Sequence, residues 1–212
     1  MFQLIKSLAG AALVLFLFSA CADNTGSAAA QAGTSSGDYQ KEIEKRLFSY
    51  IDHTNKSEWD AMLDMVYPKV FETISRGEMV STFEGMESQG MTILTENPKI
   101  LNYSEVQTVE GEDFVFVDYS ADLTVKLEGE QFQDETIQEM FRAQLEQAYG
   151  PGTVSANETG DEMYVKAEKM LFAISESGKN DWKFLENNGP DVSLLEGYLP
   201  AEVIEKYKVK EE

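Results

Sequence analysis

The sequence predicts an α+β fold in which helices come first and antiparallel strands follow. Apolar residues recur at helical spacing through residues 39–86, with charged residues between them. From residue 91 the pattern changes, and residues 119–127 alternate between apolar and polar side chains. Such alternation is typical of an antiparallel strand with one buried face. A second long strand is predicted over residues 163–175, so we expect the N-terminal helices to pack on one face of a sheet.

Three helices are predicted in the first part of the chain. The first covers residues 39–51, which carry an apolar stripe. The second begins at Ser57, which opens a capping-box-like run, and ends or bends at Pro68 because proline cannot continue a helix. A third start signal is the run from Ser75 to Glu78, and apolar residues follow it at helical spacing.

One helix is predicted to interrupt the strands. Residues 91–94 and 99–103 read as two extended segments on either side of Pro98, and the alternating strand follows them. A helix near residues 136–149 comes next and ends at the Gly-Pro-Gly run 150–152. This helix is therefore expected to be an insertion between strands.

The last part of the chain is predicted to return to the sheet and to end in a helix. Within residues 163–175 the alternation slips around Lys169 and Met170, which predicts a β-bulge and a bend. A turn then leads to a short strand at residues 182–185. A proline opens the final helix, which is predicted over residues 201–208.

The first 37 residues are predicted to be an export signal and a tether. Residues 1–20 carry one charged side chain, Lys6, and an apolar run over residues 8–18 that is shorter than the roughly 20 residues of a membrane-spanning helix. Residues 22–37 contain no aromatic or branched apolar residue, which favours a flexible linker. One α+β domain is then expected over residues 38–212.

The end of the export signal resembles the lipobox of bacterial lipoproteins. The resemblance lies in Phe18-Ser19-Ala20-Cys21, and Cys21 is the only cysteine of the chain. It implies cleavage before Cys21 and attachment of lipid to that residue, with acyl chains such as palmitate that anchor the protein stably in a membrane. Because Ala22 is not the aspartate that retains enteric lipoproteins at the inner membrane, the resemblance favours the outer membrane. The alternative is an ordinary secreted protein with an incidental cysteine.

The chain is strongly acidic, with a formal net charge of −21. This charge opposes binding to nucleic acid, where lysine and arginine must face phosphates, and close approach to anionic lipid headgroups. Solubility is the simplest role for the charge. An acidic face for a cationic partner is the alternative.

The order of elements over about residues 39–186 resembles the nuclear-transport-factor-2-like, or cystatin-like, fold. The segments that carry the resemblance are residues 65–71, 114–117 and 182–186, and they look like those of exported lipoproteins from Bacteroidetes-type bacteria. The resemblance implies a curved antiparallel sheet that wraps around helices. Together the sheet and the helices would form a cone with an apolar pocket. The helix near residues 136–149 departs from the minimal fold.

Isomerases and cyclases of this fold place an aspartate base and a tyrosine or histidine donor inside the cone. The candidates here are Asp118, Asp122, Tyr67, Tyr103 and Tyr119. The alternation puts both aspartates on the polar face of their strand, away from the apolar set. We therefore predict no catalytic residue and keep an isomerase- or cyclase-type enzyme as the alternative function.

No metal or cofactor site is predicted. His53 is the only histidine, so a histidine cluster is excluded, and its place at the end of the first helix suits a stabilising charge. Acidic turns at residues 110–113 and 158–162 lack the ligand register of a calcium loop.

The remaining indication of function is a set of apolar side chains. Aromatic and methionine side chains crowd the helical stripes, and some would line a pocket if the cone is open. They are Tyr50, Trp59, Tyr67, Phe71, Phe83, Met62, Met65, Met79 and Met86. We expect a membrane-anchored lipoprotein of the cell envelope that binds a small apolar ligand or a protein partner without catalysis. A further alternative is an assembly module, a homodimer for example, that pairs through the convex face of its sheet.

Overall fold

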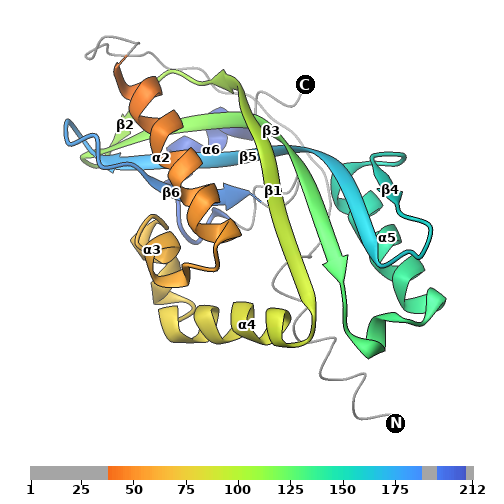
Figure 1. Cartoon of the computed structure of the whole chain (residues 1–212). Coiled ribbons are helices and arrows are strands. Elements are labelled where there is room, and N and C mark those ends of the chain that lie inside the picture. Colours follow the sequence, from red (N-terminus) through yellow and green to blue (C-terminus); the bar gives the residue numbers. More distant parts are fainter. Residues whose placement is uncertain (1–37, 188–194, 209–212) are drawn as a thin grey trace.

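The computed structural model describes residues 38–187 and 195–208, and in them helices accompany a six-stranded antiparallel sheet that does not close into a barrel (Figure 1). The α+β class is therefore confirmed. The predicted export signal, Cys21 and the linker lie outside the described residues. Among the residues described, no helix has the length and apolar character needed to cross a membrane.

The first predicted helix is confirmed as α2 (Asp38–Asn55), which buries Tyr39, Ile43, Leu47 and Ile51 along one stripe. These four residues are three or four positions apart, so they lie on the same side of the helix. They pack in one cluster with Val117 and Leu171 of the sheet, among others.

The second predicted helix is shorter than expected, and its start was wrong. It comprises α3 (Trp59–Leu63), and a 3-10 turn, η1 (Pro68–Glu72), follows with proline at its first position. Ser57 does not cap α3, because its backbone has a positive φ of 56° and its hydroxyl donates a hydrogen bond to Glu87 instead.

The third start signal is confirmed and proves to be a complete capping box. Helix α4 (Arg76–Ser88) begins after Ser75, whose side chain accepts a hydrogen bond from the Glu78 N–H at 3.3 Å. The Glu78 carboxylate accepts one in return from the Ser75 N–H at 3.0 Å. Two N–H groups that the helix itself leaves without partners are satisfied in this way.

The six strands of the described structure pair with one another in antiparallel fashion. The strands are β1 (Met91–Tyr103), β2 (Gln107–Val109), β3 (Glu112–Leu127), β4 (Val154–Ala156), β5 (Glu162–Glu176) and β6 (Lys183–Asn187). Their order is β1-β3-β5-β4, with β2 paired to β3 and β6 paired to β5. The two extended segments around Pro98 are one strand, because an irregularity between Glu96 and Lys99 lets β1 continue past the proline.

Both remaining helices are confirmed. Helix α5 (Glu135–Tyr149) lies between β3 and β4 along the chain, after a short 3-10 turn, η2 (Glu130–Phe132), and so it is an insertion between strands. Helix α6 (Ala201–Lys208) follows Pro200.

The predicted β-bulge at Lys169 and Met170 was wrong. Strands β3 and β5 pair without interruption from Glu112 opposite Glu176 to Lys126 opposite Glu162. Lys169 therefore keeps the face of Ala167 and Leu171, whose side chains belong to the core. The slip in the alternation marks a charged side chain at a core-facing position.

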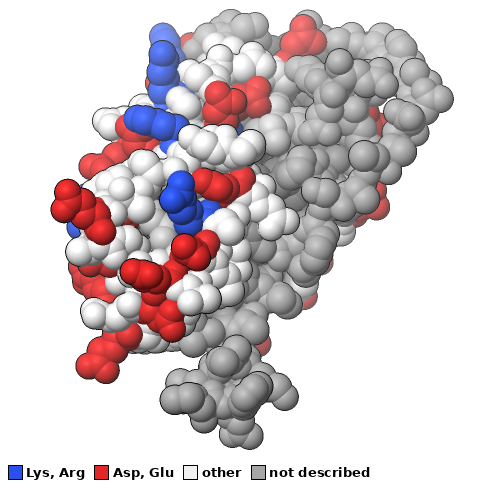
Figure 2. Space-filling view, turned by 90° about the vertical axis from the view of Figure 1, so that its right-hand side faces the viewer, with Lys and Arg blue, Asp and Glu red and all other residues white. Residues whose placement is uncertain are grey.

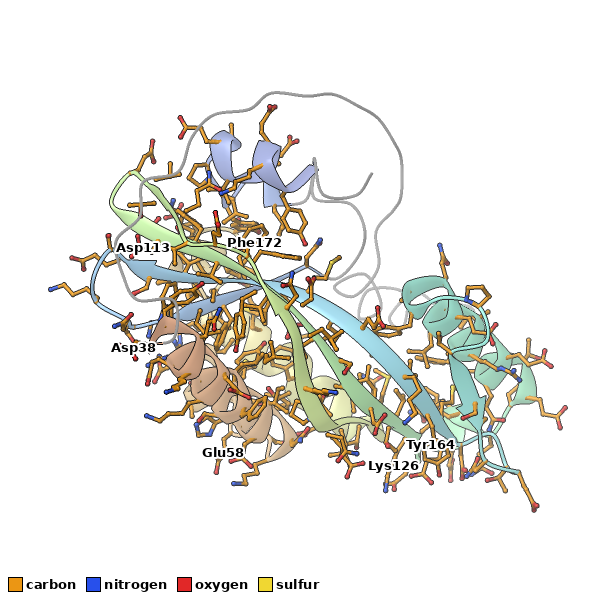
Figure 3. The ribbon with its side chains drawn as sticks, turned by 90° about the horizontal axis from the view of Figure 1, so that it is seen from above. Asp38, Glu58, Asp113, Lys126, Tyr164 and Phe172 are labelled. Atoms are coloured by element: carbon orange, nitrogen blue, oxygen red, sulfur yellow. The ribbon has the colours of Figure 1, made fainter. Side chains whose placement is uncertain are left out.

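Alternate residues of the central strands pack against helices on opposite faces of the sheet. Val115, Val117 and Tyr119 of β3 pack on the side of α2, which we call the α2 face. Phe116 of β3 and Phe172 of β5 pack on the other side against α6, and we call this the α6 face. Figure 3 shows α2 and α6 on opposite sides of the sheet, with Phe172 directed toward α6.

Helix α6 is fixed to the sheet by aromatic contacts. The Tyr207 ring lies edge-on to Phe116 with centroids 4.0 Å apart, and 5.1 Å from the Phe172 ring. All three core clusters of the described structure consist of residues between Tyr39 and Tyr207, so this part of the chain contains its own hydrophobic core.

Candidate functional site

A cavity of about 330 Å³ lies between the α2 face of the sheet and the helices α2, α3 and α4. Its apolar walls include Trp59, Met62, Met79, Phe83, Met86 and Leu123. Helix α4 has no fully buried residue, and three of its apolar side chains, Met79, Phe83 and Met86, border this cavity. The Trp59 and Phe83 rings stack with centroids 4.7 Å apart and so join α3 to α4 beside the cavity.

The pocket-lining residues expected from the helical stripes fall into two groups. Six of the nine border the cavity: Tyr50, Trp59, Met62, Met79, Phe83 and Met86. Three do not. Met65 is buried in the core on the α2 face, and Phe71 packs in the small cluster around α3. Tyr67 belongs to the cluster on the α6 face, and its hydroxyl donates a hydrogen bond to Glu112 at 2.8 Å.

An ion pair lines the cavity among these apolar groups. Lys169 Nζ lies 3.2 Å from Glu186 Oε2, and the side chains are 17% and 20% exposed. Lys169 comes from β5 and Glu186 from β6, where Glu186 lies opposite Leu171. Along their strands, both residues alternate with residues that face α6. Their side chains therefore lie on the α2 face of the sheet.

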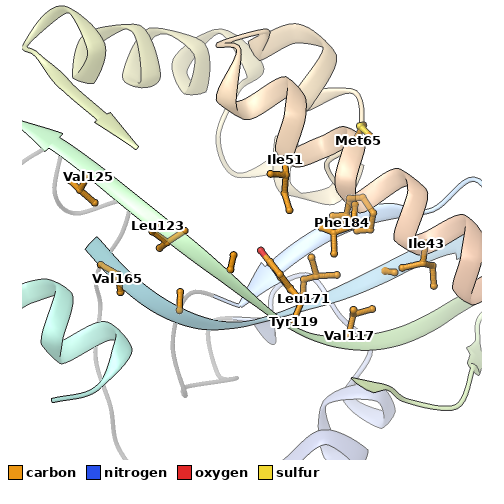
Figure 4. Packing of buried hydrophobic residues seen from close by; sticks show 14 of the residues in the cluster. Ile43, Ile51, Met65, Val117, Tyr119, Leu123, Val125, Val165, Leu171 and Phe184 are labelled. Carbon is orange, nitrogen blue, oxygen red and sulfur yellow. The ribbon is translucent and has the colours of Figure 1, made fainter. Parts of the chain in front are cut away.

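Three tyrosines surround the ion pair. Tyr50 comes from α2, Tyr119 from β3 and Tyr149 from the end of α5, and all three line the cavity. Figure 4 shows the Tyr119 side chain rising from the sheet toward the helical side, near Ile51 and Leu123. Lys169 Nζ lies 5.8 Å from the centre of the Tyr119 ring, within the range of a cation–π contact.

The surroundings fix the protonation of these groups at neutral pH. Burial raises the pKa of all three tyrosines, the Glu186 carboxylate adds to this rise, and the Lys169 ammonium opposes it. Burial alone would lower the pKa of Lys169, but Glu186 and the tyrosine oxygens hold it well above its ordinary value. The cluster therefore combines one ammonium group, one carboxylate and three neutral hydroxyl groups.

The aspartates considered as catalytic candidates lie away from the cavity, as predicted. Asp122 accepts a hydrogen bond from Lys166 Nζ at 2.6 Å, and Asp118 accepts one from Asn102 Nδ2 at 3.3 Å. Both point to the opposite side of β3 from Tyr119, which is the one candidate of that set that lines the cavity.

Tyr103 and His53 have structural partners. The Tyr103 hydroxyl donates a hydrogen bond to the Gln40 carbonyl at 3.1 Å. His53 lies in the last turn of α2, as predicted, with Nδ1 2.5 Å from Glu58 Oε2. Neither residue borders the cavity.

The two acidic turns are ordinary turns in this structure. Gly111 lies between β2 and β3, and Asp161 accepts hydrogen bonds from Asn157 and Thr159 at 2.7 and 2.6 Å. Among residues 38–187 and 195–208, no three histidine, cysteine or acidic side chains are grouped as a metal site would require.

Lys169 and Glu186 were not predicted as site residues. The signal for Lys169 was present in the sequence, since a lysine interrupts the apolar series Val165, Ala167, Leu171. Glu186 carries no comparable signal, because its position depends on the pairing of β6 with β5.

No known protein family matches the chain in a scan of family models, and a search of the curated proteins finds no match either. The functional assignment consequently depends on the cavity and the groups that line it.

Proposed function

We propose that this protein is a lipid-anchored lipoprotein of the cell envelope whose domain binds a small, largely apolar ligand in the cavity under α4. We propose further that the sheet and helices form a cone of the nuclear-transport-factor-2-like type. The observation that carries the proposal is the cavity itself, whose apolar walls enclose a small set of polar groups. Its volume of about 330 Å³ lies in the lower part of the range typical of small-molecule pockets.

The walls can supply most of the binding free energy. Trp59, Phe83 and Met79 present aromatic and thioether surface, and removal of such surface from water contributes about 25 cal/mol per Å². The tyrosine hydroxyls and the ion pair can orient a polar atom of the ligand. A few placed polar groups in an apolar pocket are the usual arrangement of a binding site.

Catalysis has less support than binding. Two of the described residues that line the cavity carry carboxylates, and each has a partner: Glu186 pairs with Lys169, and Glu87 accepts a hydrogen bond from the Ser57 hydroxyl. A general base must be able to accept a proton from the substrate. Because Lys169 carries its proton at neutral pH, it is not a nucleophilic amine either.

The binding proposal is tested with residues 22–212, which include every described core residue. The probe is N-phenyl-1-naphthylamine, an uncharged compound that fluoresces strongly in apolar surroundings. We expect saturable binding. Met79→Gln should weaken it about fivefold, which corresponds to about 1 kcal/mol of lost apolar contact.

The matched control is Met140→Gln, since Met140 lies on α5, is 50% exposed and does not border the cavity. This variant should bind the probe as the unaltered protein does. Absence of saturable binding, or equal weakening by both variants, would refute the proposal.

The anchor is tested separately in a bacterial host. We expect the full chain to incorporate an alkyne-tagged palmitate and to sediment with membranes, whereas Cys21→Ser should do neither. The 16-residue linker 22–37 would allow the domain to lie ~20–24 Å from the anchor. Labelling of the Cys21→Ser protein would show that the lipid is attached elsewhere.

A further inference from the structure

We infer that the Lys169–Glu186 pair makes the cavity selective for uncharged ligands. The occupant would be a molecule with an apolar body and a neutral hydrogen-bonding end, such as a hydroxyl, carbonyl or amide group. This inference rests on the proposed binding function and names the chemical class of the ligand.

The charges of the ion pair balance each other at the site. Lys169 Nζ and Glu186 Oε2 lie 3.2 Å apart, so their charges cancel at close range. An anionic ligand would place two negative charges beside one ammonium group, and a cationic ligand would do the reverse. A charge that is removed from water without a partner of its own is strongly disfavoured.

The described residues of the cavity wall provide no second cation that could pair with an anionic ligand. Among the described residues that border the cavity, Lys169 is the only lysine or arginine, while Glu87 adds a second acidic group in the wall. Outside the cavity, Figure 2 shows acidic side chains, with basic ones between them, on the described part of the surface seen from the side of α5. With a net charge of −21, the field of the whole chain also opposes the approach of an anion.

The polar groups of the cavity wall can form hydrogen bonds with a neutral group of a ligand. The hydroxyls of Tyr50, Tyr119 and Tyr149 are neutral, and each can donate and accept a hydrogen bond. The Lys169 ammonium has three N–H donors, and Glu186 is the acceptor in its one salt bridge among the described residues. A neutral oxygen or nitrogen of a ligand could be satisfied here without any change in net charge.

A pair of related probes tests the inference. N-phenyl-1-naphthylamine and 8-anilinonaphthalene-1-sulfonate share the same aromatic frame, and only the second carries a negative charge. We expect the uncharged probe to bind residues 22–212 at least tenfold more tightly. Equal affinities, or tighter binding of the sulfonate, would overturn the inference and leave the binding function in place.

Two variants should change this preference in opposite directions. Glu186→Gln leaves Lys169 as an excess positive charge, so the preference for the uncharged probe should fall about tenfold. Lys169→Gln leaves an excess negative charge, and the preference should rise. The double variant should return to the preference of the unaltered protein. Equal changes in both single variants would refute a role of the pair in selectivity.

A second test does not alter the pair and so remains informative if those variants fold poorly. Thr82 borders the cavity from α4, whereas its neighbour Ser81 is exposed and does not. Thr82→Lys adds a positive charge to the wall and should reduce the preference for the uncharged probe about tenfold, but Ser81→Lys should leave it unchanged. An unchanged preference in Thr82→Lys would overturn the inference. Failure of both probes to bind the unaltered protein would instead refute the proposed function.

Discussion

Removal of either partner of the Lys169–Glu186 pair should destabilise the protein far more than removal of a surface ion pair. For unit charges 3.2 Å apart, Coulomb's law with an effective dielectric constant of about 20 gives about 5 kcal/mol. Since each side chain keeps roughly a fifth of its surface exposed, we expect a coupling energy of about 3 kcal/mol. A double-mutant cycle of Lys169→Met and Glu186→Gln measures this energy directly.

The chain offers a matched control on the same strand. Lys166 Nζ lies 2.6 Å from Asp122 Oδ1, a shorter distance, but the two side chains are 82% and 35% exposed. An exposed ion pair contributes little, so the cycle of Lys166→Met and Asp122→Asn should give a coupling energy much smaller than that of Lys169 and Glu186. Comparison of the two cycles separates the effect of burial from that of distance.

Both cycles are measured by urea unfolding at neutral pH, with the free energy of unfolding of four proteins in each cycle. A coupling energy below about 1 kcal/mol for Lys169 and Glu186 would show that water reaches the pair freely. The pair would then not be sheltered from solvent in the cavity, contrary to its burial in the structure. A larger coupling energy in the Lys166 cycle would refute the reasoning in the same way.

Two further predictions concern other parts of the fold. Tyr207→Ala should cost about 3–4 kcal/mol in urea unfolding, because Tyr207 is 6% exposed and its ring packs on Phe116. Tyr164→Ala should cost much less, since Tyr164 is 43% exposed. Similar losses in the two variants would mean that α6 does not cover the sheet in solution. Burial, with the nearby Glu44 carboxylate, raises the pKa of Tyr103 from 10.0 to about 12. The folded state then holds this proton more tightly than the unfolded state, so stability is retained below about pH 10 and falls as the pH rises to about 12. Tyr103→Phe should make that fall shallower, and an unchanged slope would contradict the raised pKa.

Local patterns were sufficient to predict most of the helices and strands. The stripe of α2, the capping box at Ser75 and the alternation of residues 119–127 in β3 each depend on residues close together in the chain. Such features form from local geometry and burial of one face. The predicted start of α3 was wrong because the Ser57 hydroxyl donates a hydrogen bond to Glu87, which is 30 residues away in the sequence.

The site was predictable only in its apolar part. Six of the nine candidate side chains line the cavity because helical periodicity identifies the face that turns inward. The β-bulge at Lys169 was predicted wrongly, because a charged residue in an apolar series looks the same in sequence whether the strand bulges or the charge is buried. Only the pairing of β5 with β3 and β6 distinguishes the two cases, and that pairing is not local.

Native mass spectrometry of residues 22–212, purified from the host bacterium, tests the central claim most directly. We expect a reproducible extra mass that is lost on denaturation and that belongs to a small molecule without net charge. A protein that consistently carries no ligand, and that also fails to bind the uncharged probe, would contradict the claim that the cavity is a binding site.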